Sequence, residues 1–85
     1  MVENDKRVGF VGIIIKDRKK QSQVVNEILM EFGDRIIARM GIPYHARNVS
    51  VITLVVDAIT DDVGSLTGRL GRIPGVSVRS ALSKE

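Results

Sequence analysis

The feature that most constrains this chain is residues 48–58, NVSVITLVVDA, its longest run of β-branched residues. With the period of two that a strand imposes, one face carries Ile52, Leu54, Val56 and Ala58, and the other carries Val49, Val51, Thr53 and Val55. A strand that is apolar on both faces lies inside a sheet with material packed on each side. The sequence therefore predicts a central strand, in a chain whose 85 residues build one modest core.

Three further segments have strand character. Residues 8–15 are also apolar on both faces, and Gly9 and Gly12 within them indicate close approach by a neighbouring backbone. Residues 34–41 alternate as a strand, whose predicted core side carries Ile36, Ala38 and Met40. Residues 41–46 then connect this strand to residues 48–58 as a long hairpin. Residues 76–82 form the last predicted strand.

Two amphipathic helices are predicted between the strands. Residues 21–32 place one apolar stripe at Val25, Ile28, Leu29 and Phe32. Ser22 is the expected N-cap of this helix, and Gly33 the left-handed residue that ends it. Residues 59–73 place the second stripe at Val63, Leu66, Leu70 and Ile73.

Capping and helix-breaking residues flank the second predicted helix. Thr60 or Asp61 is its expected cap, and the acidic pair Asp61 and Asp62 complements the helix dipole. A Pro-Gly pair at residues 74–75 ends it. A stripe of glycines lies opposite the apolar stripe, at Gly64, Gly68 and Gly71. Two interpretations stay open: a smooth strip that another backbone or a ligand approaches, or a tolerated weakness in the helix.

The predicted order is therefore β-α-β-β-α-β, in two halves that correspond at a spacing of roughly 40 residues. Interleaved right-handed crossovers of this kind build an α+β fold, the ferredoxin-like sandwich: a four-stranded antiparallel sheet with two helices on one face. We expect a single domain over residues 1–85, with its core at 7–82 and polar tails at 1–6 and 83–85.

Two helices cover only one face of such a sheet. The uncovered face is expected to carry Ile37, Val51, Thr53 and Val55, with Arg35, Arg39 and Arg79 toward its edges. An aliphatic centre with an arginine rim is typical of a protein–protein interface. The pattern predicts a homodimer or homotetramer; the alternative is an ordinary half-exposed sheet.

Composition excludes several classes of site. The chain is 44% hydrophobic and 27% charged, with a net charge of +3 and no cysteine. One histidine, His45, cannot build a transition-metal site alone, and helix capping explains Asp61 and Asp62, so neither a metal nor a cofactor is expected. No apolar run approaches the roughly 20 residues of a membrane span, and the polar N-terminus lacks a signal peptide. A cytoplasmic location is expected, and the basic residues 16–20 are interpreted as a solvated loop.

Two blocks carry a family resemblance: RMGIPYHARNVSVITLVVDA at residues 39–58 and LTGRLGRIPGVSVRSAL at 66–82. They resemble regulators of iron-only hydrogenase systems, which have an ACT-like ferredoxin fold. More distantly, the chain is similar to the effector domain of nickel-responsive regulators, but it lacks the several histidines and the cysteine of that family. The resemblance implies a non-enzymatic regulatory domain that associates with itself and binds a small ligand at a subunit interface. The chain has no helix-turn-helix, so direct DNA contact is not expected.

The ACT-like resemblance also directs attention to a ligand surface. The Asp-x-x-Gly pattern expected after the first strand is missing there, and a similar pattern at residues 61–64 follows the third strand instead. The candidate ligand-binding residues are Arg39, Gly41, Pro43, Tyr44, Asp61 and Gly64. Backbone N–H groups near residues 61–63 would receive an anion, with Arg39 adding charge.

Two other functions remain open from the sequence. RNA-recognition motifs share this topology, but such a platform for RNA or single strands needs exposed aromatics on its central strands, where the chain offers at most Phe10. A small acylphosphatase-like hydrolase would use Arg18 and Asn48, but the glycine-rich segment of that family is not recognisable in residues 8–18.

Overall fold

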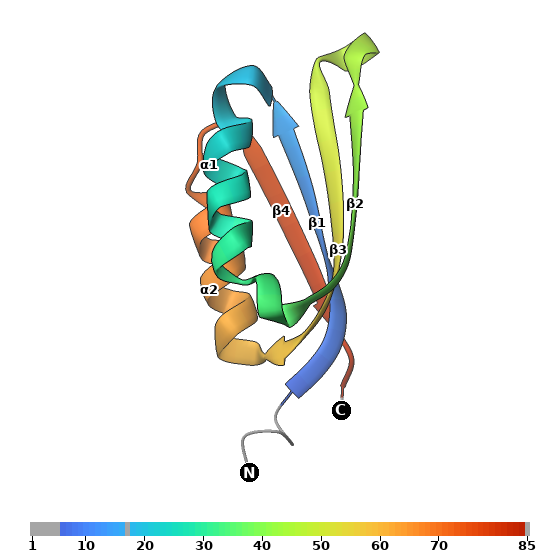
Figure 1. Ribbon diagram of the computed structural model, residues 1–85, viewed down its shortest axis with the longest axis vertical. Coiled ribbons are helices and arrows are strands. Elements are labelled where there is room, and N and C mark those ends of the chain that lie inside the picture. The colour runs from blue at the N-terminus through green and yellow to red at the C-terminus, as the bar shows by residue number, and fades with distance from the viewer. Residues whose placement is uncertain (1–5, 17, 85) are drawn as a thin grey trace.

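The computed structural model describes residues 6–16 and 18–84 and has the predicted β-α-β-β-α-β order (Figure 1). Its elements are β1 (Lys6–Lys16), α1 (Arg18–Glu31), β2 (Ile36–Tyr44), β3 (Val49–Ile59), α2 (Thr60–Gly71) and β4 (Val76–Leu82). Short 3₁₀ helices at Gly33–Arg35 and His45–Arg47 lead into β2 and link β2 to β3.

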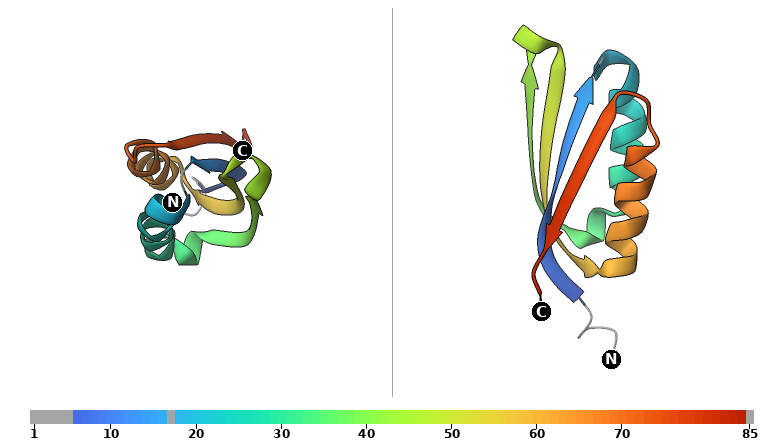
Figure 2. Two further views of the ribbon diagram at one scale, coloured as in Figure 1. Left: turned by 90° about the horizontal axis from the view of Figure 1, so that it is seen from above. Right: turned by 180° about the vertical axis from the view of Figure 1, so that it is seen from behind.

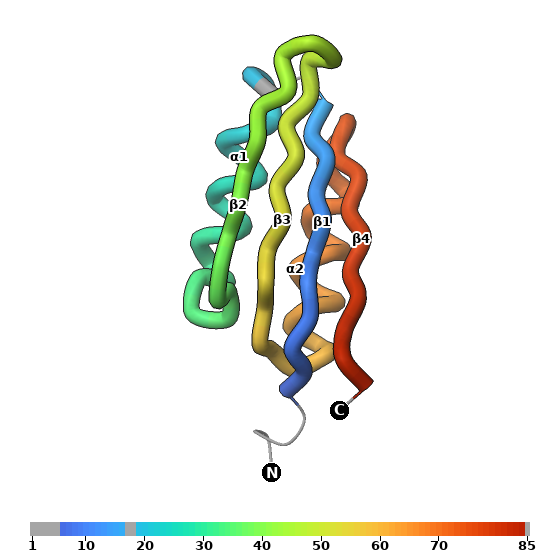
Figure 3. Tube along the Cα trace, turned by 90° about the vertical axis from the view of Figure 1, so that its right-hand side faces the viewer, coloured from blue at the N-terminus to red at the C-terminus, as the bar shows by residue number. Residues whose placement is uncertain are grey.

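The four strands form one antiparallel sheet in the order β2-β3-β1-β4 (Figure 3). The two strands with apolar residues on both faces, β1 and β3, lie at its centre, as predicted. Both helices lie on the same face of the sheet, which leaves the other face uncovered (Figure 2). The structure confirms the α+β ferredoxin-like sandwich.

The core lies between the sheet and the helices. The predicted stripes of α1 and α2 are buried, and each of their eight side chains is at most 9% exposed. The sheet contributes alternate residues of its central strands, namely Val11, Ile13, Ile15, Ile52, Leu54, Val56 and Ala58. The period-two and helical patterns therefore identified the core-facing side of β3 and of both helices correctly, and the structure settles the facing of β1, which the sequence left open.

A β-bulge in β2 overturns the predicted facing of that strand. Ile36 pairs with Val56, but Ala38 pairs with Val55, so the register shifts between Ile36 and Ala38. An extra residue in one strand reverses the side to which all later residues point. Ala38 and Met40, predicted to lie beneath the helices, are instead exposed on the uncovered face.

The same strand is longer than predicted. Residues 41–44, interpreted as a connecting loop, continue β2 to Tyr44. The hairpin is closed by the 3₁₀ helix and by Asn48, whose φ of 52° places it in the left-handed region. Asparagine tolerates this region better than most residues, which explains its position at the turn.

The ends of α1 also differ from the prediction. The helix begins at Arg18, so Ser22 lies inside it and is not its N-cap. Arg18, Lys19 and Lys20 are helical instead of belonging to a solvated loop, because lysine and arginine are good helix formers. Gly33 does not take the left-handed conformation; it begins a 3₁₀ helix.

For α2, the predicted capping side chains are wrong. Ile59 occupies the N-cap position with no side-chain hydrogen bond, and Thr60 begins the helix. Asp61 and Asp62 do lie in the first turn, where the dipole prediction placed them. The helix ends at Gly71, two residues before Ile73.

Close backbone approach is confirmed at Gly9 and absent at Gly12. A Cβ on Gly9 would lie less than 3.0 Å from backbone atoms of Ala81 and Leu82 on β4. A Cβ on Gly12 would have no neighbour within 4 Å. Gly9 thus permits β1 and β4 to pair closely, whereas Gly12 leaves a hollow on the uncovered face.

The ends of the domain extend beyond the predicted core. Lys6 is the first residue of β1. Ser83, placed in the predicted tail, donates its backbone N–H to the carbonyl oxygen of Val8 at 2.8 Å. Arg7 Nη1 donates to the backbone oxygens of Ser83 and Lys84.

Candidate functional site

A cleft of about 190 Å³ lies between α1 and the outer half of the β2–β3 hairpin. Its floor is apolar and includes Ile15 and Ile52, which are 1% and 6% exposed. Its polar lining consists of Ser22 and Asn26 from α1, Ser50 from β3 and Arg39 from β2. Residues 41–43 of β2 complete the wall. A buried apolar floor with a few polar groups around it is the usual composition of a small-ligand site.

The bulge in β2 creates this cleft. Because of the reversed facing, Arg39 pairs with Leu54 and Gly41 pairs with Ile52, both of which point toward the helices. Beneath α1 the strand therefore presents an arginine, a glycine and Pro43, where the uninterrupted alternation would have placed Met40 and Ile42. The larger apolar side chains that would fill the space lie on the other face.

Arg39 is held toward α1 by a hydrogen bond. Its Nη2 donates to Oδ1 of Asn26 at 2.5 Å. A guanidinium has five N–H donors, so this contact orients the group and leaves most donors available. Arg39 has no carboxylate partner in the part of the chain that the structure describes.

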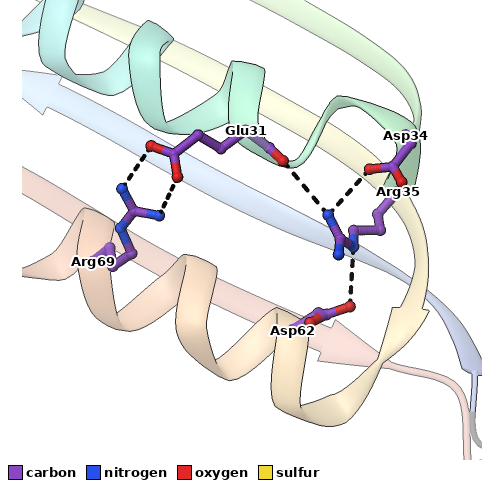
Figure 4. A network of polar contacts seen from close by, with 5 residues as sticks. All are labelled: Glu31, Asp34, Arg35, Asp62 and Arg69. Carbon is purple, nitrogen blue, oxygen red and sulfur yellow. Dashed lines mark hydrogen bonds and ion pairs between the residues drawn. The ribbon is translucent and has the colours of Figure 1, made fainter.

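Two other arginines, Arg35 and Arg69, form ion pairs at the helix layer (Figure 4). Arg69 on α2 donates two hydrogen bonds to Glu31 on α1, at 3.0 and 2.8 Å. Arg35 donates to Asp62 at 3.0 Å and to Asp34 at 3.1 Å. The hydrogen bonds from Arg69, together with the positive charge of Arg69, hold the pKa of Glu31 below its ordinary value. The same hydrogen bonds raise the pKa of Arg69. These contacts tie α1 and its end to α2.

The predicted ligand-binding residues do not meet at one place. Arg39, Gly41 and Pro43 line the cleft. Tyr44 pairs with Val49, and this register places it on the uncovered face at the hairpin end. Asp61 and Gly64 lie in α2, beyond the opposite end of β3.

The separation follows from the register. Arg39 pairs with Leu54, and five more residues of β3 run to Ile59 before α2 begins, a length of roughly 16 Å along the strand. The start of α2 and Arg39 therefore do not form one anion site. Asp62, next to Asp61, is already paired with Arg35.

The uncovered face is strongly apolar. Of the eleven large hydrophobic residues that are exposed in the described chain, the register places eight here: Val8, Phe10, Ile14, Met40, Ile42, Tyr44, Val51 and Val55. The predicted interface residues Val51, Thr53, Val55 and Arg79 share this face, and Ile37 lies at its border in the bulge, 61% exposed. Arg35 and Arg39, expected on its rim, contact the helix layer instead.

Six of these eight apolar residues were not assigned to this face from the sequence. Met40, Ile42 and Tyr44 were missed because the bulge and the length of β2 were not predicted. Val8, Ile14 and Phe10 were not assigned because the facing of β1 was left open, and Phe10 is 56% exposed. Next to it, Gly12 opens a hollow of about 400 Å³ that is also lined by Ile14, Val51 and Arg79.

No group of three or more histidine, cysteine, aspartate or glutamate side chains gathers to hold a metal within residues 6–16 and 18–84. None of the helices in that part of the chain is long and apolar enough to cross a membrane. The cleft and the uncovered face are therefore the two candidate sites in the described part of the chain.

Fold and surface together define a small ACT-like domain of the ferredoxin-like class. Residues 7–80 match the model of the TM1266-like family, described as "Iron-only hydrogenase system regulator, putative". The chain belongs to this family. It is similar to the solved structure of uncharacterized protein TM1266 from Thermotoga maritima, with 38% identity and a TM-score of 0.89 over 93% of this chain and 99% of that chain.

Two more distant structures show the fold alone. The ACT domain of a GTP pyrophosphokinase from Chlorobium tepidum has 16% identity and a TM-score of 0.73, over 91% of this chain and 88% of that one. The apo form of CPII, a nitrogen regulatory PII-like protein from Thiomonas intermedia, has 11% identity and a TM-score of 0.55, over 91% of each chain. A comparison with curated proteins finds no match. The family description supports a regulatory role.

Proposed function

We propose that this chain is a non-enzymatic regulatory domain of an iron-only hydrogenase system and that it acts as a homodimer joined through the uncovered face of its sheet. The observation that carries the proposal is the concentration of exposed apolar side chains on this one face. Each aliphatic or aromatic side chain buried there would contribute about 1.5–3 kcal/mol. Contiguous apolar patches of this kind mark interaction sites.

The shape of the face favours a second copy of the chain as its occupant. Phe10 protrudes and Gly12, two residues along the same face of β1, leaves a hollow. In a twofold dimer with antiparallel packing of the two β1 strands, Phe10 of each copy enters the hollow of the other, as an isologous interface requires.

Charge does not select between the two orientations of the strands. Lys16 lies at one end of this face on β1, whereas Lys6 on β1 and Asp57 on β3, which pairs with Val8, both lie at the other end. The protruding Phe10 and the hollow at Gly12 are therefore the argument for antiparallel packing. Pairing of the free edges of β2 or β4 would extend such a dimer to a homotetramer.

A non-enzymatic role agrees with the lining of the cleft. Ser22 and Ser50 are its hydroxyl groups, and the described lining contains no histidine, carboxylate or lysine that would activate them as nucleophiles. Arg39 supplies charge for binding but is not a base at neutral pH.

Light scattering of the full chain at micromolar concentration tests the proposal. We expect twice the chain mass, or four times for the tetramer. Phe10→Glu is expected to give monomers, and Gly12→Leu, which fills the hollow, to weaken the dimer. Met30→Glu is the matched control, because Met30 on α1 is 79% exposed and outside the face. A wild-type monomer, or equal effects of Phe10→Glu and Met30→Glu, would contradict the proposal.

The structure shows that Phe10, the one aromatic residue considered for RNA binding from the sequence, is exposed. Phe10 is exposed on the central strand β1, but the face of β3 offers aliphatic residues and Thr53, and Tyr44 lies at the end of the edge strand β2. Stacking of successive bases needs aromatic side chains on neighbouring central positions. Salt-sensitive binding to an oligonucleotide pool would favour this alternative.

A further inference from the structure

The two halves of the domain differ in how their helices meet the sheet. Under α2, a Cβ placed on Gly71 would lie 3.6 Å from Val78 Cγ1 of β4, so helix and strand are in contact. Beneath α1, the corresponding outer strand is β2. A Cβ on Gly41 would meet only Ile52 Cγ1, at 3.8 Å. The space that apolar side chains fill in the second half is left as a cleft in the first.

Among the described residues, the charge that lines the cleft is positive only. Arg39 is its only charged lining residue among those described, and no acidic side chain lines it. Asn26 accepts a hydrogen bond from Nη2 of Arg39 and so directs the guanidinium across the cleft. The remaining N–H donors match the two oxygens of a carboxylate, the arrangement in which arginine binds most specifically.

We propose that this cleft binds a small organic carboxylate, whose oxygens accept hydrogen bonds from Arg39 and whose short apolar body lies on Ile15 and Ile52. The ligand is the effector of the regulatory domain, and to that extent the inference rests on the proposed function. The site lies within one chain, on the side of the sheet opposite the proposed dimer face.

Size and charge narrow the ligand class. A volume of about 190 Å³ is below the roughly 300–1,000 Å³ typical of pockets for drug-sized ligands, so a short carbon chain fits. Without an acidic side chain in the described lining, the ammonium group of an amino acid would lose water and gain no counter-charge. The site therefore favours a carboxylate that carries no ammonium group.

Amide NMR of the ¹⁵N-labelled full chain tests the proposal with four related probes and one inorganic anion. Butyrate and 2-oxobutyrate are expected to shift the amide signals of Asn26, Arg39 and Gly41. Butyramide, which lacks the charge, is expected to leave them unchanged, and 2-aminobutyrate to bind more weakly than butyrate. Equal binding of phosphate and butyrate, or of butyramide and butyrate, would overturn the carboxylate assignment.

Three variants locate the site. Arg39→Gln is expected to weaken butyrate binding at least about tenfold, because a hydrogen bond to a charged group is lost. Gly41→Val keeps a strand-compatible residue and fills the cleft, with the same expected loss. Arg72→Gln, at the C-terminal end of α2 and outside both the cleft and the uncovered face, is the control and is expected to leave binding unchanged. Retained affinity in Arg39→Gln, or butyrate-induced shifts confined to the uncovered face, would overturn the proposal.

The two proposals can fail separately. Light scattering on the same samples reports the oligomeric state, and Arg39→Gln is expected to keep the wild-type mass. A monomeric chain that binds butyrate through Arg39 would refute the dimer and retain the cleft. If the chain is a dimer and the amide signals of Asn26 and Arg39 respond to none of the carboxylates, the cleft proposal is refuted and the dimer is retained.

Discussion

Both terminal nitrogens of Arg69 donate hydrogen bonds to the carboxylate oxygens of Glu31, at 3.0 and 2.8 Å, across the boundary between the two helices (Figure 4). The Phe32 ring lies under this layer, 5.9 Å from the Arg69 guanidinium carbon and 5.5 Å from that of Arg35. Two arginines and the first-turn acid Asp62 therefore connect α1 to α2 above the core.

This pair predicts a pH-dependent contribution to stability. The pKa of Glu31 lies below its ordinary 4.5 in the folded chain, so the folded state binds fewer protons than the unfolded state. The contribution is fully present above the unfolded pKa and is lost as the pH falls through the lower folded pKa. Thermal unfolding should show Glu31→Gln slightly less stable than wild type at pH 7, with the difference shrinking below pH 4.5.

The matched control for this prediction is Glu27→Gln. Glu27 lies one turn earlier on α1 and accepts only a long 3.4 Å hydrogen bond from Gln23 among its described contacts. Its replacement should change the melting temperature little at any pH. A Glu31→Gln difference that is the same at pH 3 and pH 7 would contradict the ion-pair explanation.

The close pairing of β1 with β4 predicts a severe effect at Gly9. A Cβ there meets the backbone of Ala81 and Leu82, which cannot move without breaking the strand pairing. Gly9→Ala should lower the free energy of unfolding by about 1–3 kcal/mol, the usual cost of overpacking. Chemical denaturation measures it, and wild-type stability in this variant would show that β4 can shift.

Gly68 gives the opposite expectation. A Cβ there meets nothing within 4 Å, and the residue lies inside α2. Gly68→Ala should raise the free energy of unfolding by about 0.8–1 kcal/mol, because alanine is the better helix former. If the variant also keeps its oligomeric mass, the glycine stripe is a tolerated weakness; a loss of mass would instead favour a contact surface on α2.

Regular periodicity explains what could be predicted from sequence. The two-sided apolarity of residues 8–15 and 48–58 identified the central strands, and the 3.6-residue stripes identified the buried faces of both helices. These patterns are reliable because burial of one face imposes them directly. For β4 the predicted bounds, 76–82, equal the observed ones.

The bulge is the reason that the rest could not be predicted. Ile36 and Ile37 are both apolar, so the sequence of β2 fits either facing, and its phase is set only by pairing with β3. That single shift moves Met40, Ile42 and Tyr44 to the uncovered face and brings Arg39 to Asn26. Gly-Ile-Pro also has the composition of a turn, and Pro43 is tolerated in β2 because that strand lies at the sheet edge.

The left-handed turn between β2 and β3 predicts a residue-specific effect at Asn48, whose φ is 52°. A side chain branched at Cβ is strained there, so Asn48→Val should cost about 1–2 kcal/mol or more of unfolding free energy. Asn48→Gly should be tolerated, since glycine adopts this conformation readily. Equal stability of the valine and glycine variants in denaturant would show that the turn adopts another conformation in solution.

Leu54 and Val55 are neighbours on β3 that point to opposite faces, so their truncation should cost very different amounts of stability. Leu54 is fully buried beneath the helices, so Leu54→Ala should lower the free energy of unfolding by about 2–5 kcal/mol. Val55 is 37% exposed on the uncovered face, so Val55→Ala should cost about 1 kcal/mol or less in dilute, monomeric samples. At concentrations where the chain associates, Val55→Ala should lower the free energy of unfolding by more, because a partner that binds only the folded state stabilises it by mass action.

Denaturation of both variants at two protein concentrations measures both effects. A Val55→Ala cost that is independent of concentration would mean that this side chain contributes nothing to self-association.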